Sequence, residues 1–560
     1  MKIFSFIFFL YLVCFLISCQ TNAQLPTDYH QHTFSESDTL RGKLSPARTC
    51  YDVKFYDLRV DVYPVTKTII GEVDIVFQST RNFEQLQIDL YENLKIDRII
   101  YHGKPVLFQR QHNAVFVQLP EIKKGVTDQF TVYYQGSPIV SKNPPWTGGF
   151  IWTLDHHGKD WITVACEGDG ASIWWPNKDH LSDEPDSMMI RVTVPEELFC
   201  VSNGNLIGTY PKENNRKQFD WKVSYPINNY NVTVNIGDYV HFSETYQAED
   251  KTTMPLDYYV LSYNLEKANI HFEQVDGILK CFENLLDKYP FWKDGYALVE
   301  TPYLGMEHQG AIAYGNMYTR GYLGGMIPAD MNWDYIIVHE TGHEYFGNSI
   351  SCNDHAEMWI HESFTTYLEA LYVECSSGYE DYLRYLQVFR NSAYIKNKKP
   401  IVGPLNVNYT KFGSSDHYFK GSWVLHTIRH AIGDDELWFR LFREFYQHFS
   451  MNHVDTEMII SWFNKRTKLD LAPIFRQYLY HPTIPRLLYS LEQKGENLIF
   501  THQWKTDEQD FEMPLLVGDP TNYQRVKIKN KKSKTNLGKI DANDFKIATE
   551  FYLIDTELIE

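Results

Sequence analysis

The chain has 560 residues, of which 43% are hydrophobic, and 53 basic against 71 acidic side chains give it a formal net charge of −18. This length and hydrophobic content predict a folded protein of about three domains. The acidic balance argues against a nucleic-acid partner and is mildly unfavourable for anionic surfaces.

The first residues have the pattern of an export signal. Lys2 is followed by the apolar run Ile3–Ile17, which is barely long enough to span a bilayer. We therefore predict a signal peptide over residues 1–18. Leu16-Ile17-Ser18-Cys19 resembles a bacterial lipobox, which predicts a lipid anchor on Cys19 and a place in the cell envelope, either the periplasm or the outer membrane. Thr21-Asn22-Ala23 offers an ordinary cleavage site, which would give a secreted protein, and an uncleaved anchor would also place the chain outside the cytosol.

The cysteine content is compatible with an exported protein but does not establish the compartment. Besides Cys14 and Cys19 there are six scattered cysteines, with no CxxC pair among them. One or two disulfides are compatible with an exported protein, and the sequence leaves their pairing open.

From about Tyr51 to Val240 apolar and polar residues alternate, which is the period of a strand with one buried face. The alternation is clear in the runs Leu58–Val62, Val73–Phe77, Ala114–Val117 and Asn231–Val234. We predict a large antiparallel β domain over residues 25–260. One stretch of it, Cys166–Asp179, sets Glu167 a few residues before Trp174-Trp175-Pro176. A solvated loop acid is the simplest interpretation of Glu167.

After about Asn264 the period becomes 3.6, and one apolar stripe predicts a helix that ends at Tyr289-Pro290. A strand, Tyr296–Val299, precedes the stretch Leu304–Ala311, where Gly305 permits close backbone approach. Further helices are predicted at Ser414–Gly421, which begins with a polar N-cap, and at Asp435–Phe449, Asp455–Lys465 and Leu471–Tyr480. The result is a mostly helical domain over residues 261–482, and a return to strands predicts a small β domain over residues 483–560.

The strongest chemical signal is His339-Glu340-Thr341-Gly342-His343, together with Glu362. Histidines four residues apart lie on one face of a helix, and this spacing suits two imidazoles that bind one Zn²⁺. Glu340 can then reach a metal-bound water, and the eighteen residues before Glu362 allow a turn and a second helix that brings a third ligand. A chance match is the alternative, because the chain has 21 histidines, but the apolar residues on both helices argue against it.

His-Glu-x-x-His, eighteen residues and then Glu resembles the signature of the M1 family of zinc aminopeptidases (gluzincins). The flanking Phe346-Gly347-Asn348 and Trp359–Phe364 also resemble that family, although His361-Glu362-Ser363 stands where the family usually has Asn-Glu-Gly. The resemblance covers nearly all of the mature chain. It implies an N-terminal β saddle, a thermolysin-like catalytic domain and a small C-terminal β-sandwich, and it predicts a short form without the family's large helical C-terminal domain.

The resemblance also assigns roles to residues outside the zinc motif. Leu304–Ala311 resembles the family's Gly-Ala-Met-Glu-Asn motif, which implies that Gly305 and Met306 bind the substrate backbone and that Glu307 binds its α-ammonium. Glu167 matches a second amine anchor. Tyr418, in Tyr-x-Lys-Gly, matches the tyrosine that stabilises the oxyanion. The alternatives are a surface acid for Glu307 and a packing tyrosine for Tyr418.

The predicted function is therefore a zinc aminopeptidase with one Zn²⁺ per chain, held by His339, His343 and Glu362. It removes the first residue of peptides that have a free N-terminus, by attack of a zinc-activated water with Glu340 as the base. Three alternatives stay open: an endopeptidase and an epoxide hydrolase on the same fold, and a non-catalytic peptide-binding module. The preferred N-terminal residue and the oligomeric state are not readable from the sequence.

Overall fold

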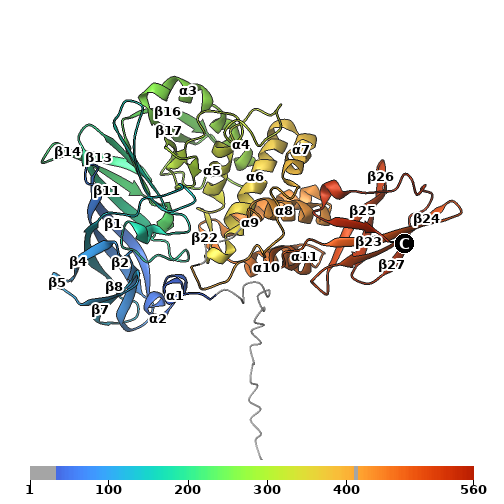
Figure 1. The fold of residues 1–560 in the computed structure, drawn as a ribbon, viewed down its shortest axis with the longest axis horizontal. Helices are drawn as coiled ribbons and strands as arrows, with labels where there is room; N and C mark the ends of the chain where they lie inside the picture. The colour runs from blue at the N-terminus through green and yellow to red at the C-terminus, as the bar shows by residue number, and fades with distance from the viewer. Residues whose placement is uncertain (1–32, 409–413, 560) are drawn as a thin grey trace, which may run out of the picture.

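The computed structural model describes residues 33–408 and 414–559. Figure 1 shows three regions along its long axis: an N-terminal β-rich region, a central helical region, and β-sheets near the C-terminus. The predicted signal peptide and Cys19 lie outside the described residues. Within the described ranges, no helix combines the length and the apolar character needed to cross a membrane.

The N-terminal region is built on an eight-stranded sheet in which alternate side chains are buried, as the sequence predicts. Val73, Ile75 and Phe77 of one strand, for example, are fully buried. In spatial order the strands are β13 (Asn205–Lys212), β14 (Arg216–Val223), β11 (Ser187–Pro195), β1 (Tyr51–Tyr63), β2 (Thr68–Ser79), β8 (Thr127–Gly136), β4 (Leu94–Tyr101) and β5 (Lys104–Pro105). The sheet is not wholly antiparallel, because β1 and β11 pair in parallel. These two strands are far apart in sequence, so no hairpin fixes their direction.

Two smaller sheets complete this region. One contains β3 (Phe83–Asp89), β7 (Ala114–Ile122) and β6 (Phe108–Gln111); the other contains β12 (Phe199–Ser202), β15 (Val234–Gly237), β10 (Asp160–Ala165) and β9 (Gly149–Leu154). The predicted strand Asn231–Val234 is wrong for most of its length, because Asn231 ends a 3₁₀ turn, η3 (Asn229–Asn231). The side chain of Asn228 accepts a hydrogen bond from Tyr230 N and stabilises that turn. Strand β10 ends two residues before Glu167.

A mixed five-stranded sheet lies next in the chain. Its order is β16 (Tyr239–Gln247), β17 (Thr253–Leu261), β18 (Tyr296–Glu300), β20 (Ile312–Tyr314) and β19 (Gly305–Met306). The sheet joins residues 239–261 to strands that follow residue 261, whereas the sequence placed them in the β domain ending at 260. Alternation shows that a segment is a strand but not which sheet it joins.

The central region consists of packed helices around a short parallel pair of strands, β21 (Ile350–Cys352) and β22 (Asn452–Val454). Its helices are α3 (Leu265–His271), α4 (Gln274–Leu285), α5 (Tyr335–Tyr345), α6 (Trp359–Ser377), α7 (Tyr379–Phe389), α8 (Phe419–Ile432), α9 (Asp435–Phe449), α10 (Thr456–Arg466) and α11 (Ala472–Leu479). Phe346 and Phe364 stack at 4.7 Å beside Phe442, and these rings form part of the core between α6 and α9. Helix α8 begins at Phe419, not within Ser414–Tyr418, and no side chain caps it.

The described residues after 485 form two further sheets. One has the order β27 (Ser533–Asn536), β24 (Asn497–Lys505), β23 (Arg486–Lys494) and β29 (Asp555–Leu558); the other is β26 (Asn522–Lys529), β25 (Glu512–Asp519) and β28 (Lys546–Ile547). In Figure 1 they form the red end of the molecule, beside α8 and α11. Arg525 donates hydrogen bonds to His430 O at the end of α8, which joins this region to the helices.

Among the described cysteines, Cys281 of α4 and Cys375 of α6 form a disulfide across 94 positions of sequence. The double change C281S/C375S should lower the free energy of unfolding by about 2–4 kcal/mol, because it frees a long loop in the unfolded chain. Denaturant unfolding measures this loss, and Cys200→Ser, a buried free cysteine, is the control. Alkylation of both Cys281 and Cys375 in unreduced, unfolded protein would contradict the pairing.

Candidate active site

Helix α5 carries His339, Glu340 and His343 and is buried along its whole length. Its first turn is fixed by Asp334, whose side chain accepts hydrogen bonds from Ile336 N and Ile337 N. This capping satisfies backbone donors that would otherwise be unpaired at the helix N-terminus. The helix therefore holds its histidines at a fixed depth inside the protein.

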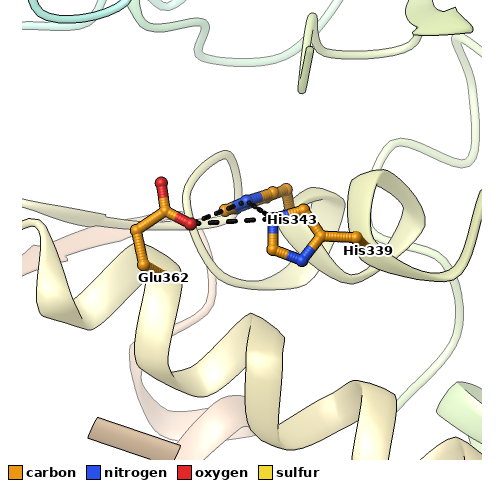
Figure 2. Close-up of side chains that lie close together, drawn as sticks. All are labelled: His339, His343 and Glu362. Carbon is orange, nitrogen blue, oxygen red and sulfur yellow. Dashed lines mark hydrogen bonds and ion pairs between the residues drawn. The ribbon is translucent and has the colours of Figure 1, made fainter. Parts of the chain in front are cut away.

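Helix α6 brings Glu362 to the two histidines. Glu362 lies in the first turn of α6, and Figure 2 shows its carboxylate pointing at both imidazoles. The two helices approach closely at Gly342, where an added Cβ would lie 3.1 Å from the Thr365 side chain. The glycine inside the motif thus allows the close packing that brings the three candidate ligands together.

The three ligand atoms have the separations that a tetrahedral zinc site requires. Nε2 of His339 and Nε2 of His343 are 3.1 Å apart, and Oε2 of Glu362 lies 3.7 Å and 3.4 Å from them. Ligands about 2.0–2.2 Å from a tetrahedral Zn²⁺ would be roughly 3.3–3.5 Å apart. The observed triangle is close to that size.

Hydrogen bonding also leaves the ligand atoms ready for a metal. Nδ1 of His339 lies 2.5 Å from Glu369 Oε1, and Nδ1 of His343 lies 3.0 Å from Phe346 O, so both Nδ1 atoms donate. In neutral imidazoles this leaves an unprotonated Nε2 on each ring. Oε2 of Glu362 is buried and accepts no hydrogen bond from any described residue. Three lone pairs that face one another in a buried space fit a cation such as Zn²⁺.

The electrostatic field at this point favours positive charge. Burial alone would lower the pKa of His339, but the Glu362 and Glu369 carboxylates raise it well above its ordinary value. Burial, with help from Glu307 and Glu362 and against the two histidines, raises the pKa of Glu340 to about 8. A divalent cation bound to the triad would reverse that effect on Glu340 and favour its carboxylate.

The triad opens into a cavity of about 690 Å³ that also contains the predicted substrate-binding residues. The cavity is lined by Glu167, Gly305, Met306, Glu307, His339, Glu340, His343, Glu362 and Tyr418, among others. Strand β19 is the last strand of its sheet, so among the described strands it pairs only with β20 and has one edge without a partner strand. At Gly305 an added Cβ would lie 2.6 Å from Glu340 Oε1 and 2.7 Å from Ile336 Cγ2, so the glycine lets β19 pass close to α5 without displacing either side chain.

Glu307 is buried, and several groups hold it in place. Tyr230 donates a 3.0 Å hydrogen bond from its hydroxyl to Glu307 Oε1, and Asn348 Nδ2 donates to Glu307 O. His361 accepts a hydrogen bond on Nε2 from Cys352 N, and its Nδ1 lies 3.5 Å from the Tyr230 hydroxyl. His361, one of the departures from the family pattern, therefore supports the tyrosine that holds Glu307.

Glu167 and Tyr418 complete the wall of the cavity. Desolvation in the cavity and repulsion by Glu307 raise the pKa of Glu167 well above its ordinary value. The ring of Tyr418 stacks near that of His339, with centroids 6.0 Å apart. Ser363 donates from its hydroxyl to His417 O, and Gly421 leaves the room that this contact needs. Ser363, the other departure from the pattern, thus positions the residue next to Tyr418.

Sequence reasoning missed the residues that orient the ligands. Glu369 lies seven residues after Glu362, two turns along α6 and on the same face, and its other oxygen accepts from the Tyr385 hydroxyl. That spacing was a usable signal, since carboxylates commonly hold the second nitrogen of a metal-binding histidine. Tyr230 and Tyr385 come from distant segments and carry no local signal.

Two histidines and a glutamate from two packed helices, with a further glutamate beside them, define a metallopeptidase site of the His-Glu-x-x-His type. Known proteins agree with this class. Residues 270–478 match the Peptidase family M1 domain, and residues 53–230 match the Peptidase M1 N-terminal domain. The chain belongs to peptidase family M1, a family of zinc metallopeptidases.

Individual relatives are distant. The chain is similar to Aminopeptidase N of Escherichia coli (21% identity, 69% of this chain and 44% of the relative) and of Lactobacillus helveticus (22%, 88% and 58%). It is also similar to Leukotriene A-4 hydrolase of Xenopus laevis (23%, 53% and 49%). The chain thus spans about half the length of these curated relatives.

Solved structures of other proteins share this fold. An M1 zinc metallopeptidase from Deinococcus radiodurans superposes with a TM-score of 0.67 at 20% identity, over 80% of this chain and 98% of the other. A structure of that enzyme bound to a Tyr-Ser-Ala substrate gives a TM-score of 0.65 over the same shares. These likenesses support an α+β fold with an N-terminal β-rich domain and a helical catalytic domain.

Glu369→Gln should weaken zinc binding about 10–100-fold, because the amide keeps the shape of the side chain but loses the charge that orients His339. Zinc affinity measured by competition with a chelator tests this, and Glu380→Gln, at an exposed position on α7, is the control. Equal zinc affinity in the Glu369 variant and the wild type would show that Glu369 does not support the site.

Proposed function

We propose that the protein is an aminopeptidase that uses one Zn²⁺ per chain to remove the first residue of peptides with a free N-terminus. The observation that carries the proposal is the placement of Glu307 and Glu167 on the same cavity as the His339–His343–Glu362 triad. An endopeptidase has no need for buried carboxylates at the end of its cleft. The aminopeptidase names of two relatives, and the peptide held by a structural relative, support the same substrate class.

The chemistry follows from the order of groups along the cavity. Zn²⁺, when bound to the triad, would acidify a water and polarise the scissile carbonyl. Glu340, one residue from His339, takes a proton from the attacking water and passes it to the leaving amine. The Tyr418 hydroxyl donates to the oxygen that becomes negative in the transition state.

Two carboxylates, those of Glu307 and Glu167, and strand β19 bind the N-terminal part of the peptide substrate. The unpaired edge of Gly305–Met306 can hydrogen-bond an extended peptide backbone, as exposed sheet edges do. Glu307 and Glu167 repel each other inside the cavity, and a bound ammonium relieves that repulsion. The ammonium then fixes how far the peptide can enter, so that the first peptide bond lies at the metal.

We propose in addition that the protein is exported, with Cys19 as its lipid anchor in the cell envelope. The Cys281–Cys375 disulfide supports an oxidising compartment. For the domains, we propose an N-terminal β saddle to about residue 238, a thermolysin-like catalytic domain to about 482, and a C-terminal β-sandwich formed by the two last sheets. Buried Leu498, Phe500 and Leu515 support the sandwich, because they come from both of those sheets.

Glu340→Gln should keep its zinc and lose roughly 10²–10⁴-fold in kcat, because the amide can no longer accept a proton and Glu340 is not a ligand. Metal analysis and steady-state kinetics on the same preparation measure both quantities. Near-normal turnover would remove Glu340 from the role of base.

The decisive experiment compares a free and an N-acetylated aminoacyl p-nitroanilide. Loss of a buried charged partner costs about 3–5 kcal/mol, so Glu307→Ala should lower kcat/KM on the free amine by roughly 10²–10³-fold. Glu167→Ala should lower it less, because Glu307 remains. The acetylated substrate has no ammonium to bind, so the wild type should barely cleave it.

Asp257→Ala, at a surface position of β17 beside His241, is the control and should keep wild-type kinetics. Efficient wild-type cleavage of the acetylated substrate would favour an endopeptidase. An equal loss on both substrates in Glu307→Ala would mean that Glu307 does not select free amino termini.

A further inference from the structure

Arg41 is a buried arginine that contacts the loop of Glu167 from outside the matched family domains. It lies on α1 (Glu36–Gly42), before residue 53, where the match to the M1 N-terminal domain begins. Only 6% of Arg41 is exposed. Its guanidinium donates from Nη2 to Gly168 O, directly after Glu167, and Nε lies 3.3 Å from Asp179 Oδ2.

The same guanidinium acts on the loop through Tyr91. Nη1 of Arg41 donates to the Tyr91 hydroxyl, which in turn donates to Asp169 O, both at 3.3 Å. Arg41 therefore holds Gly168 O directly and Asp169 O through Tyr91. Gly170 has a φ of +81°, and an added Cβ there would lie 1.9 Å from Arg41 Nη2, so the loop is shaped around this side chain.

Helix α1 is itself hydrogen-bonded to both the β-rich region and the central region. Gln87 donates to Leu40 O from the β-rich region, and Asn408 N donates to Asp38 O from the catalytic region. At Gly42 an added Cβ would lie 2.2 Å from the Val407 backbone, so the chain passes very close to that segment. In Figure 1, α1 lies beneath the N-terminal sheets, on the side of the central helices. The helix thus holds Arg41 at a defined place between the two regions.

We propose that Arg41 is a positioning residue for recognition of the substrate amine: it fixes the Glu167 loop so that the Glu167 carboxylate faces the cavity. The inference rests on the proposed aminopeptidase function for its substrate and on the hydrogen bonds above for its mechanism. Without the guanidinium fork, Gly168 O and the Tyr91 hydroxyl lose their donor and the loop gains freedom. Amine binding then weakens, while the zinc ligands, which lie on α5 and α6, keep their places.

The test variant is Arg41→Lys, which keeps a positive charge beside Asp179 but cannot donate to both Gly168 O and the Tyr91 hydroxyl with the geometry of the guanidinium fork. On the aminoacyl p-nitroanilide that the wild type cleaves fastest, its KM should rise about 10-fold, with kcat within about threefold, since one charged hydrogen bond is worth roughly 1.5 kcal/mol. In a Glu167→Gln background the same change should alter KM less than about twofold, because the effect of Arg41 acts through that carboxylate. Zinc content should not change.

Hydrogen exchange provides a measurement that does not depend on activity. The amides of Asp169 and Gly170 donate within the loop, to Glu167 O and Cys166 O, and should exchange faster in Arg41→Lys. Arg48→Lys is the matched control. Arg48 is a buried arginine of the neighbouring α2 (Pro46–Thr49) that pairs with Asp89 and makes no hydrogen bond to residues 166–170.

Unchanged loop exchange in Arg41→Lys would overturn the proposal, and so would an equal KM effect with and without Glu167. Equal acceleration of loop exchange in Arg48→Lys would also overturn it, because that result would indicate general loosening. If the wild type cleaved no free-amine substrate, the proposed function would fail, and the exchange comparison alone would decide whether Arg41 positions the loop.

Discussion

Five carboxylates and two imidazoles meet in one region between α5, α6 and β19, where leaving a charge unpaired costs about 3–5 kcal/mol. They are Glu167, Glu307, Glu340, Glu362, Glu369, His339 and His343. Two imidazoles cannot neutralise five carboxylates, and the hydroxyls of Tyr230 and Tyr385 only donate hydrogen bonds to two of them. The site therefore favours added positive charge, either as protons on the carboxylates or as a bound cation, and its geometry offers two places for it.

A divalent metal fits one of these places, and under the proposed function a substrate ammonium binds at the other. The two imidazoles at the metal position have fixed orientations, because the Nδ1 atom of each already donates a hydrogen bond. The negative charge of Glu167 and Glu307 is not neutralised by Tyr230, because its uncharged hydroxyl donates one hydrogen bond, to Glu307. If the protein acts as proposed, the site discriminates by charge, because a peptide with a blocked N-terminus leaves the two carboxylates uncompensated and does not relieve their repulsion.

The zinc motif could be predicted from the sequence because its spacing is local. Residues four apart on a helix share a face whatever the rest of the chain does, and Glu362 needs only a turn and a second helix. The β-rich and helical regions followed from periodicity in the same way. The contacts of Tyr230 with Glu307 and of Arg41 with Gly168 join segments 77 and 127 residues apart, and no period or motif encodes such a pairing. The parallel pairing of β1 with β11 was missed for the same reason.

The departures from the family pattern can be understood once those long-range contacts are known. His361 replaces an asparagine, and its ring reaches both Cys352 N and the neighbourhood of the Tyr230 hydroxyl. Ser363 replaces a glycine, and its hydroxyl occupies the space that Gly421 leaves and binds His417 O. Each substitution supplies a contact toward a different wall of the cavity, one toward Glu307 and one toward Tyr418. The side chains on either side of Glu362 therefore bond to other groups, His361 to Cys352 N and Ser363 to His417 O, while the Glu362 carboxylate lies 3.7 Å and 3.4 Å from the two imidazole nitrogens.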